Sequence, residues 1–209
     1  MNKCFFVIFL FTFTLLSGCK NEINQIENSK LVIEDFYLNH YTTNGEKLYI
    51  LESPYSVYDK SNQSYSLSKT NIKFFESNNI KYIINSDKAK LLNGDKYIEL
   101  NGNVEISDLK NNRTTIKSTN LTWNIDQSIF TLEGNVNLEN NTIILKSSKA
   151  ILDRNTNIIK FFKPVKYNYI DDNNINRYDI KSENAFYNIN NKNVLFRSET
   201  TKVESKIVF

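Results

Sequence analysis

The sequence predicts an all-β domain in which two antiparallel sheets face each other and are built from about five repeats of one short pattern. Three observations carry this prediction. The chain is rich in Ile, Tyr, Phe and Asn, and apolar residues alternate with polar ones over long stretches. A serine in the same local pattern also returns about every thirty residues, which is typical of repeat architectures. Ile, Tyr and Phe favour strands, whereas Asn is a poor helix former.

The serine closes the first half of each repeat. Apolar and polar residues alternate up to it, and a small or apolar residue follows three positions later. The five serines are Ser53, Ser86, Ser118, Ser147 and Ser182, and the residues three positions on are Ser56, Ala89, Leu121, Ala150 and Ala185.

The second half of the repeat is clearest in Leu100-Asn101-Gly102-Asn103-Val104 and in Leu132-Glu133-Gly134-Asn135-Val136. Apolar residues recur at every second position there, which indicates half-buried strands. Just after each serine, the parity of the apolar positions switches. Such a switch needs a bulge or corner, so we expect each strand to bend and its two arms to line two facing sheets.

The N-terminus predicts export and lipidation. After Lys3, an apolar run extends from Phe5 to Leu16, and Leu16-Ser17-Gly18-Cys19 follows it. Twelve helical residues span about 18 Å, too little for a hydrocarbon core of about 30 Å, but enough for a signal peptide. We interpret residues 1–18 as a lipoprotein signal peptide, residues 19–30 as lipidated Cys19 with a polar tether, and residues 31–209 as the folded domain. The alternative is an ordinary secretory signal with a chance cysteine.

Charge and motifs argue against several function classes. Removal of Lys3 with the signal peptide leaves 25 basic residues against 23 acidic ones. This balanced charge gives no indication of a nucleic-acid partner. The mature chain has no cysteine besides Cys19 and no motif for phosphate, zinc or a catalytic serine. We therefore expect no enzyme and no cofactor. His40 has a solvated or packing role in this interpretation. A calcium site at Asp171-Asp172 is an alternative that lacks a spaced ligand loop.

The repeat resembles a known family. An alternating strand, Ser-x-x-Ala, a turn and Leu-x-Gly-Asn-Val, clearest from Ser86 to Ile106 and from Ser118 to Leu138, resembles the OstA-like repeats of lipopolysaccharide transport proteins. The segment from Ile33 to Leu38, with Asn44-Gly45-Glu46 after it, resembles the start of an LptC domain. The resemblance implies a V-shaped half β-jellyroll that holds acyl chains between its sheets.

The resemblance also implies partners and a place in the cell. It implies a membrane-anchored periplasmic component of lipopolysaccharide export, which receives lipid from the membrane subunits of an ABC transporter and passes it to an LptA-like β-jellyroll domain by edge-strand pairing. The lipid on Cys19 would replace the usual membrane helix, with the inner membrane favoured. Residue 20 is Lys and not the Asp that retains lipoproteins at the inner membrane of enteric bacteria. The outer membrane is therefore the alternative location.

The lipid-groove candidates are apolar residues on the inward parity. They are Ile98, Leu100, Val104, Ile106, Trp123, Phe130, Leu132, Val136, Leu138 and Phe161. A buried CH₂ is worth about 0.8 kcal/mol, so acyl chains would be held well there. The C-terminal strand from Thr201 to Phe209 is the expected exit edge. The alternative function is a surface or periplasmic β-repeat lipoprotein with a scaffolding or adhesion role, a filled core and no lipid cargo.

Overall fold

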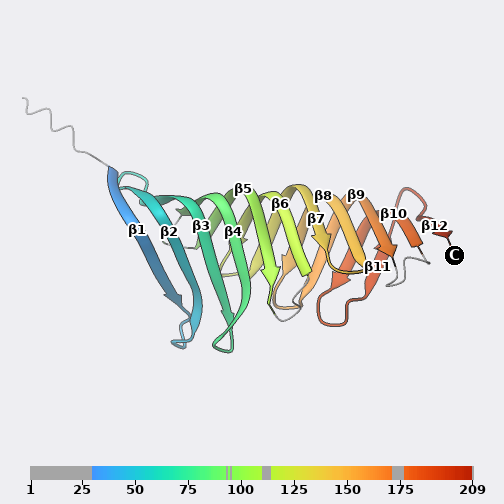
Figure 1. Cartoon of the computed structure of the whole chain (residues 1–209), viewed down its shortest axis with the longest axis horizontal. Helices are drawn as coiled ribbons and strands as arrows, with labels where there is room; N and C mark the ends of the chain where they lie inside the picture. The colour runs from blue at the N-terminus through green and yellow to red at the C-terminus, as the bar shows by residue number, and fades with distance from the viewer. Residues whose placement is uncertain (1–29, 93, 95, 110–113, 171–176, 209) are drawn as a thin grey trace, which may run out of the picture.

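The computed structural model describes residues 30–92, 94, 96–109, 114–170 and 177–208. The predicted signal peptide (residues 1–18), Cys19 and Asp171-Asp172 lie outside the described residues. Twelve strands make up one antiparallel sheet (Figure 1). They are β1 (Lys30–Tyr41), β2 (Lys47–Asp59), β3 (Ser64–Glu76), β4 (Asn79–Leu92), β5 (Tyr97–Asp108), β6 (Thr114–Asn124), β7 (Ile129–Glu139), β8 (Ile143–Asp153), β9 (Ile158–Ile170), β10 (Arg177–Asn188), β11 (Val194–Arg197) and β12 (Glu204–Val208).

The topology is a simple meander, because each strand from β1 to β10 pairs with the next one along the chain. β11 pairs with Asn184–Tyr187 of β10, and β12 pairs with Arg177–Lys181 of the same strand. These two short strands therefore share one edge of β10 end to end. The predicted all-β class is confirmed. The two facing sheets are the two arms of one continuous sheet, since every long strand of the middle region arches over a common ridge (Figure 1).

The ridge follows the repeat serines. The pairing register shifts beside these residues, for example between Lys117 and Asn120 of β6 and between Lys146 and Lys149 of β8. We call this line of bulges the fold line. At each repeat serine, the hydroxyl donates a hydrogen bond to the carbonyl two residues further on. The five donor–acceptor distances are 2.8 Å (Ser53), 3.0 Å (Ser86), 3.0 Å (Ser118), 2.8 Å (Ser147) and 2.9 Å (Ser182).

This hydrogen bond explains why the repeat carries serine. A bulge leaves backbone groups without their ladder partners, and a buried carbonyl without a partner is costly. All five serines are buried, so water does not replace the missing partner. The serine thus ends one arm and begins the next.

Glycine and asparagine make the matching bend on β5 and β7. Gly102 and Gly134 both have φ of +77°, a left-handed conformation that glycine adopts without strain. A Cβ at Gly134 would lie 2.8 Å from the Oγ1 atom of Thr119, and one at Gly102 would lie 2.6 Å from the Oδ2 atom of Asp87. The neighbouring strand therefore leaves no space for a side chain. In β9 the same place holds a cis peptide bond between Lys163 and Pro164.

Side chains fill the space between the arms. Each bent strand contributes one half to each arm. The first arm consists of the strand halves next to the turns that follow odd-numbered strands. The second arm consists of the halves next to the turns that follow even-numbered strands. Trp123 of the second arm packs edge-on against Tyr49 and Phe74 of the first arm, with ring centroids 5.1 and 5.7 Å apart. Its second-arm neighbour Phe130 is 5.1 Å away. Strands β2 and β3 thus face β6 and β7.

Replacing Ser147 with alanine tests the role of the repeat serine. We expect S147A to lower the free energy of unfolding by about 1 kcal/mol, because the carbonyl of Lys149 loses its hydrogen bond. The measurement is urea unfolding. The neighbouring Ser148 is exposed and donates to the Lys163 carbonyl at 3.2 Å, so S148A is a matched control with an expected change below about 0.5 kcal/mol. Equal effects of the two variants would contradict a special role for Ser147.

Candidate lipid groove and its seam

All ten groove candidates lie in the interior. Each is at most 2% exposed. They come from both arms of β5 and β7 and from the second arm of β6 and β9. The alternating pattern therefore identified residues that share one apolar core. Contact with lipid stays a prediction for each of them. His40, expected to be solvated or to pack, stacks on Tyr49 with the ring centroids 4.9 Å apart.

Among the described residues, side chains pack closely in the interior between these candidates. One hollow lies where the two arms meet, with Tyr82, Ile106 and Leu138 from the first arm and Leu152 and Tyr187 from the second among its lining residues. Its volume is about 10 Å³, which is barely the space that a single water requires. An acyl chain can enter this region only if the arms move apart.

The arms meet along a line opposite the fold line, which we call the seam. Lys81 at the start of β4 donates a hydrogen bond to Asn157 in the turn after β8, with an Nζ to Oδ1 distance of 3.3 Å. Lys81 also pairs with Glu76, at 2.6 Å. The guanidinium carbon of Arg154, in the same turn as Asn157, lies 3.7 Å from the centroid of the Phe74 ring. Polar and cation–π contacts thus join turns that belong to opposite arms.

Desolvation dominates the electrostatics at the seam. Burial raises the pKa of Tyr82, and the charge of Asp108 raises it further. Burial lowers the pKa of Arg154, and the charge of Glu76 acts in the opposite direction; arginine keeps its charge in proteins. Burial also raises the pKa of Tyr187, whose hydroxyl hydrogen-bonds with Asn140 of the first arm. The seam therefore holds a charged guanidinium among aromatic rings in a poorly hydrated place.

Both ends of the sheet expose apolar side chains. On the edge strand β1, Leu31, Val32, Tyr37 and Tyr41 are each more than half exposed. At the other end, Ile207 of β12 is 48% exposed. The expected C-terminal strand from Thr201 to Phe209 is shorter in the structure, because β12 covers Glu204–Val208 and Phe209 lies outside the described residues.

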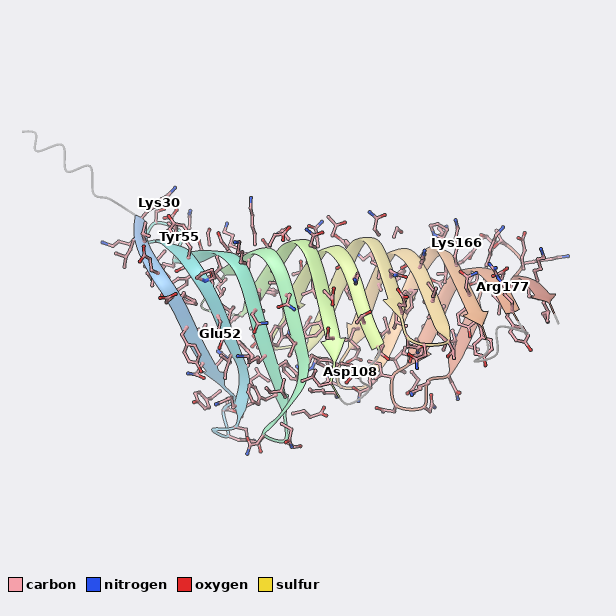
Figure 2. The ribbon with its side chains drawn as sticks, in the orientation of Figure 1. Lys30, Glu52, Tyr55, Asp108, Lys166 and Arg177 are labelled. Atoms are coloured by element: carbon pink, nitrogen blue, oxygen red, sulfur yellow. The ribbon has the colours of Figure 1, made fainter. Side chains whose placement is uncertain are left out.

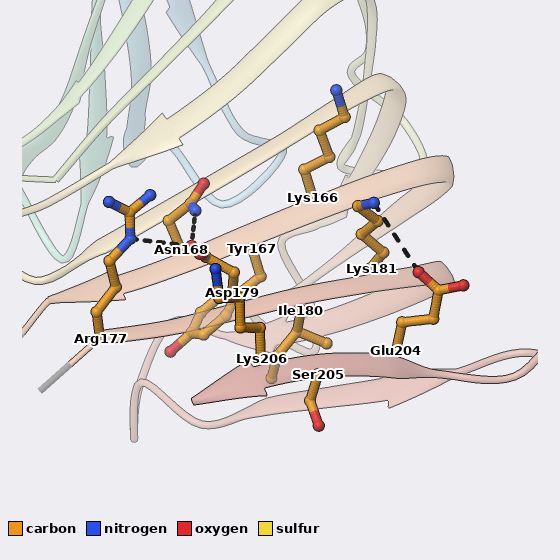
Figure 3. Close-up of a pocket in the computed structure, with 10 residues that line it drawn as sticks. All are labelled: Lys166, Tyr167, Asn168, Arg177, Asp179, Ile180, Lys181, Glu204, Ser205 and Lys206. Carbon is orange, nitrogen blue, oxygen red and sulfur yellow. Dashed lines mark hydrogen bonds and ion pairs between the residues drawn. The ribbon is translucent and has the colours of Figure 1, made fainter. Parts of the chain in front are cut away.

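A second hollow, of about 420 Å³, lies at the C-terminal edge between β9, β10 and β12 (Figure 3). Its lining is mostly charged. Arg177 pairs with Asp179 at 3.2 Å, and Lys181 lies 3.9 Å from Glu204. Figure 2 shows Lys166 and Arg177 at this end of the molecule, far from Lys30 at the other. A charged hollow suits the polar rim of an interface better than it suits acyl chains.

The buried carboxylate of Glu183 holds the segment between the short strands β11 and β12 against β10. Glu183 accepts hydrogen bonds from the backbone N–H groups of Glu199 and Thr200, at 2.9 and 3.3 Å, and from the Thr200 hydroxyl. The hydroxyl and amide donors hold the pKa of Glu183 at about 2. We call this set of contacts the Glu183 clasp. It fixes the segment between β11 and β12 at the fold line.

A match to a family model identifies the protein family of the chain. The model described as lipopolysaccharide-assembly, LptC-related, matches residues 4–144. The chain belongs to the LptC family. No curated protein matches this LptC-family chain. Among solved structures it is similar to LptH from Pseudomonas aeruginosa, described as the LptA homologous periplasmic component of the lipopolysaccharide transport device, with a TM-score of 0.49 and 13% identity over 61% of this chain and 94% of that one.

Over the described residues, no helix has the length and apolar character to span a bilayer. In the same part of the chain, His, Cys, Asp and Glu side chains nowhere gather in a group of three that could hold a metal ion. The Asp171-Asp172 loop, considered above for calcium, falls outside it.

The sequence patterns missed Arg154 and Glu183. Arg154 lies in Asp153-Arg154-Asn155, whose Asp and Asn are turn-forming residue types, and β8 ends at Asp153. Its partner Phe74 is far away in the sequence, so no local signal joins them. Glu183 follows the repeat serine Ser182 directly. In none of the other four repeats does an acidic residue of the described chain accept hydrogen bonds from a segment that joins two short strands. The repeat pattern therefore gave no reason to single out Glu183.

The Glu183 clasp predicts a pH-dependent stability. Because the folded pKa of about 2 lies below the ordinary value of 4.5, the clasp stabilises the protein above pH 4.5 and this contribution is lost as the pH falls toward 2. We expect E183Q to unfold at a lower urea concentration than the wild type at pH 7, and the difference to shrink between pH 4.5 and pH 3. The exposed Glu199 supplies the control variant E199Q. A deficit of E183Q that is independent of pH would contradict the charge-based clasp.

Proposed function

We propose that this LptC-family protein is a membrane-anchored periplasmic component of lipopolysaccharide export. It receives lipid from the membrane subunits of an ABC transporter and passes it to a similar β-jellyroll partner. The observation that carries the proposal is the pair of facing arms with a continuous apolar interior, in a chain whose family assembles lipopolysaccharide. No cofactor or covalent chemistry is needed, because transfer between similar grooves requires only binding and release.

The anchor belongs to the proposal. Cys19 carries the lipid and residues 19–30 form the tether, which ends where β1 begins at Lys30. A tether of about eleven residues spans at most about 35–40 Å, so the N-terminal edge of the sheet stays near the membrane surface. The inner membrane is favoured because the transporter would lie there, and Lys20 keeps the outer membrane as the alternative.

Lipid uptake requires the seam to part. Opening along the seam separates the two rows of turns and leaves the backbone ladder of the sheet intact, because consecutive strands remain paired in both arms. The contacts that must break are the Lys81–Asn157 hydrogen bond, the Arg154–Phe74 contact and the aromatic contacts of Trp123. Acyl chains would then replace aromatic side chains as the partners of the groove residues.

The second candidate function is a scaffolding or adhesion lipoprotein with no lipid cargo. The closed interior favours it, since a hollow of about 10 Å³ is what a filled structural core would have. The two candidates differ in whether lipid ever reaches the interior. A photocrosslinker placed in the core therefore separates them.

Phe130 and Glu133 offer such a test on one strand. Phe130 is fully buried and Glu133 is exposed on the opposite face of β7. We expect benzophenone at position 130 to form adducts with lipopolysaccharide in living cells, and benzophenone at position 133 to form far fewer, as measured by immunoblotting for lipopolysaccharide. Absence of adducts from position 130, and likewise from position 123, would favour the scaffold.

The edge strands predict where partners dock. An unpaired edge offers backbone groups to a strand of another protein, and β12 leaves one such edge beside exposed Ile207. We expect a crosslinker at Ile207 or Val203 to capture a periplasmic β-jellyroll partner. Asn191, exposed in the turn after β10, is the control position. Capture from Asn191 with equal yield, or from neither edge position, would contradict docking at the C-terminal edge.

A further inference from the structure

One donor of the Arg154 guanidinium is unusual because it has no hydrogen-bond partner among the described residues. The guanidinium lies against aromatic rings, Phe74 at 3.7 Å and Phe130 at 6.0 Å from the guanidinium carbon to the ring centroids. The charge of Glu76 also acts on it and partly offsets the lowering of its pKa by burial. Its Nε atom is buried without a partner. Arginine carries five N–H donors, and a charged donor that is desolvated without an acceptor is costly. The residue is therefore poised to accept a better partner.

Two more polar groups near Phe74 share this lack of a partner. The Tyr82 hydroxyl and the Trp123 indole N–H are both buried without a hydrogen bond among the described residues. The rings of Tyr82 and Trp123 lie 5.9 and 5.7 Å from that of Phe74. Three buried donors without hydrogen-bond partners among the described residues thus surround one aromatic ring. A ligand that brings oxygen acceptors next to apolar chains would satisfy this arrangement.

The position of Arg154 links its charge to the closure of the groove. The turn that carries it is held on the second arm, because the Arg154 N–H donates to the Ser128 carbonyl at 3.1 Å. Its guanidinium covers the face of Phe74 on the first arm. While it stays there, the seam is shut over the aromatic core. When it leaves, the face of Phe74 becomes free.

We propose that Arg154 is the recognition site for the phosphate of an anionic lipid headgroup, and that phosphate binding draws its guanidinium off Phe74 and opens the seam. This inference rests on the proposed function and adds the headgroup chemistry that selects the lipid. A guanidinium binds phosphate through two parallel, charge-assisted hydrogen bonds, which are stronger than a cation–π contact. The exchange would couple headgroup binding to the admission of acyl chains at Trp123.

Trp123 reports on this exchange directly, because it is the single tryptophan of the chain and is fully buried. The probes are dibromostearoyl phosphatidic acid and dibromostearoyl diacylglycerol, which share brominated chains and differ in the phosphate. Each is delivered to the full mature protein from micelles of an uncharged detergent, and bromine quenches Trp123 fluorescence on contact. We expect phosphatidic acid to quench at an at least about tenfold lower concentration, the factor that one charge-assisted hydrogen bond supplies.

Variants of Arg154 test whether this residue causes the preference for phosphatidic acid over diacylglycerol. R154Q should reduce the preference to within about twofold, whereas R154K should keep most of it because the charge remains. Arg197 lies 5.4 Å from the Phe186 ring centroid and away from the seam, so R197Q is a matched control that should behave as the wild type. Thermal unfolding of each variant checks that the fold is kept.

The possible outcomes distinguish a failure of the Arg154 inference from a failure of the proposed lipid-carrying function. Equal quenching by both lipids in the wild type, or an unchanged preference in R154Q, would overturn the inference while lipid carriage stands. Quenching by neither lipid in any variant would overturn lipid carriage itself. An excess of inorganic phosphate should fail to relieve quenching by phosphatidic acid. Relief would assign the site to free phosphate and overturn the lipid headgroup as its ligand.

Discussion

The bend in the middle of each strand is the constraint on which the rest of the structure depends. A long strand that stayed straight would give an open sheet with one apolar face in water. The bulge closes that face against itself, and it persists because the serine hydroxyl of each repeat satisfies a carbonyl that the ladder leaves unpaired. On β5 and β7 the left-handed Gly-Asn pair makes the matching bend where the neighbouring strand leaves no space for a Cβ. The facing arms, the buried aromatic core and the seam all follow from this line of bulges.

Two kinds of bonding therefore hold the two sides of the molecule. Along the fold line, the backbone ladder continues on both sides of each bulge, and the serine hydroxyl satisfies a carbonyl within the bulge. Along the seam, contacts depend on side chains alone, among them the Lys81–Asn157 hydrogen bond and the Arg154 guanidinium over Phe74. Separation of the arms costs these side-chain contacts and spares the sheet. A protein that opens and closes around lipid needs this asymmetry, because its edges must remain ordered enough to pair with neighbouring domains while its interior is exchanged.

The sequence predicted most of the fold because the fold is local and repetitive. Alternation fixed which residues face inward, and all ten groove candidates are buried. The parity switch at the serines located the bend, and Asp153-Arg154-Asn155 marked the end of β8. What depends on contacts between distant strands could not be predicted in this way. The turn that holds Arg154 meets Phe74 only because the sheet coils so that β8 faces β3. The division of the last strand into β11 and β12 also depends on one acceptor, Glu183, whose donors come from residues 199 and 200.

The central claim is that the arms separate along the seam when lipid binds and that the fold line stays closed. Spin labels at Asn78 and Thr156, which are exposed in turns of the first and second arm on opposite sides of the seam, test it by double electron–electron resonance in a C19A background that leaves no other cysteine in residues 19–209. We expect the distance between the labels to lengthen when lipopolysaccharide is added. A distance distribution that stays unchanged while lipid is bound in the core would contradict the account.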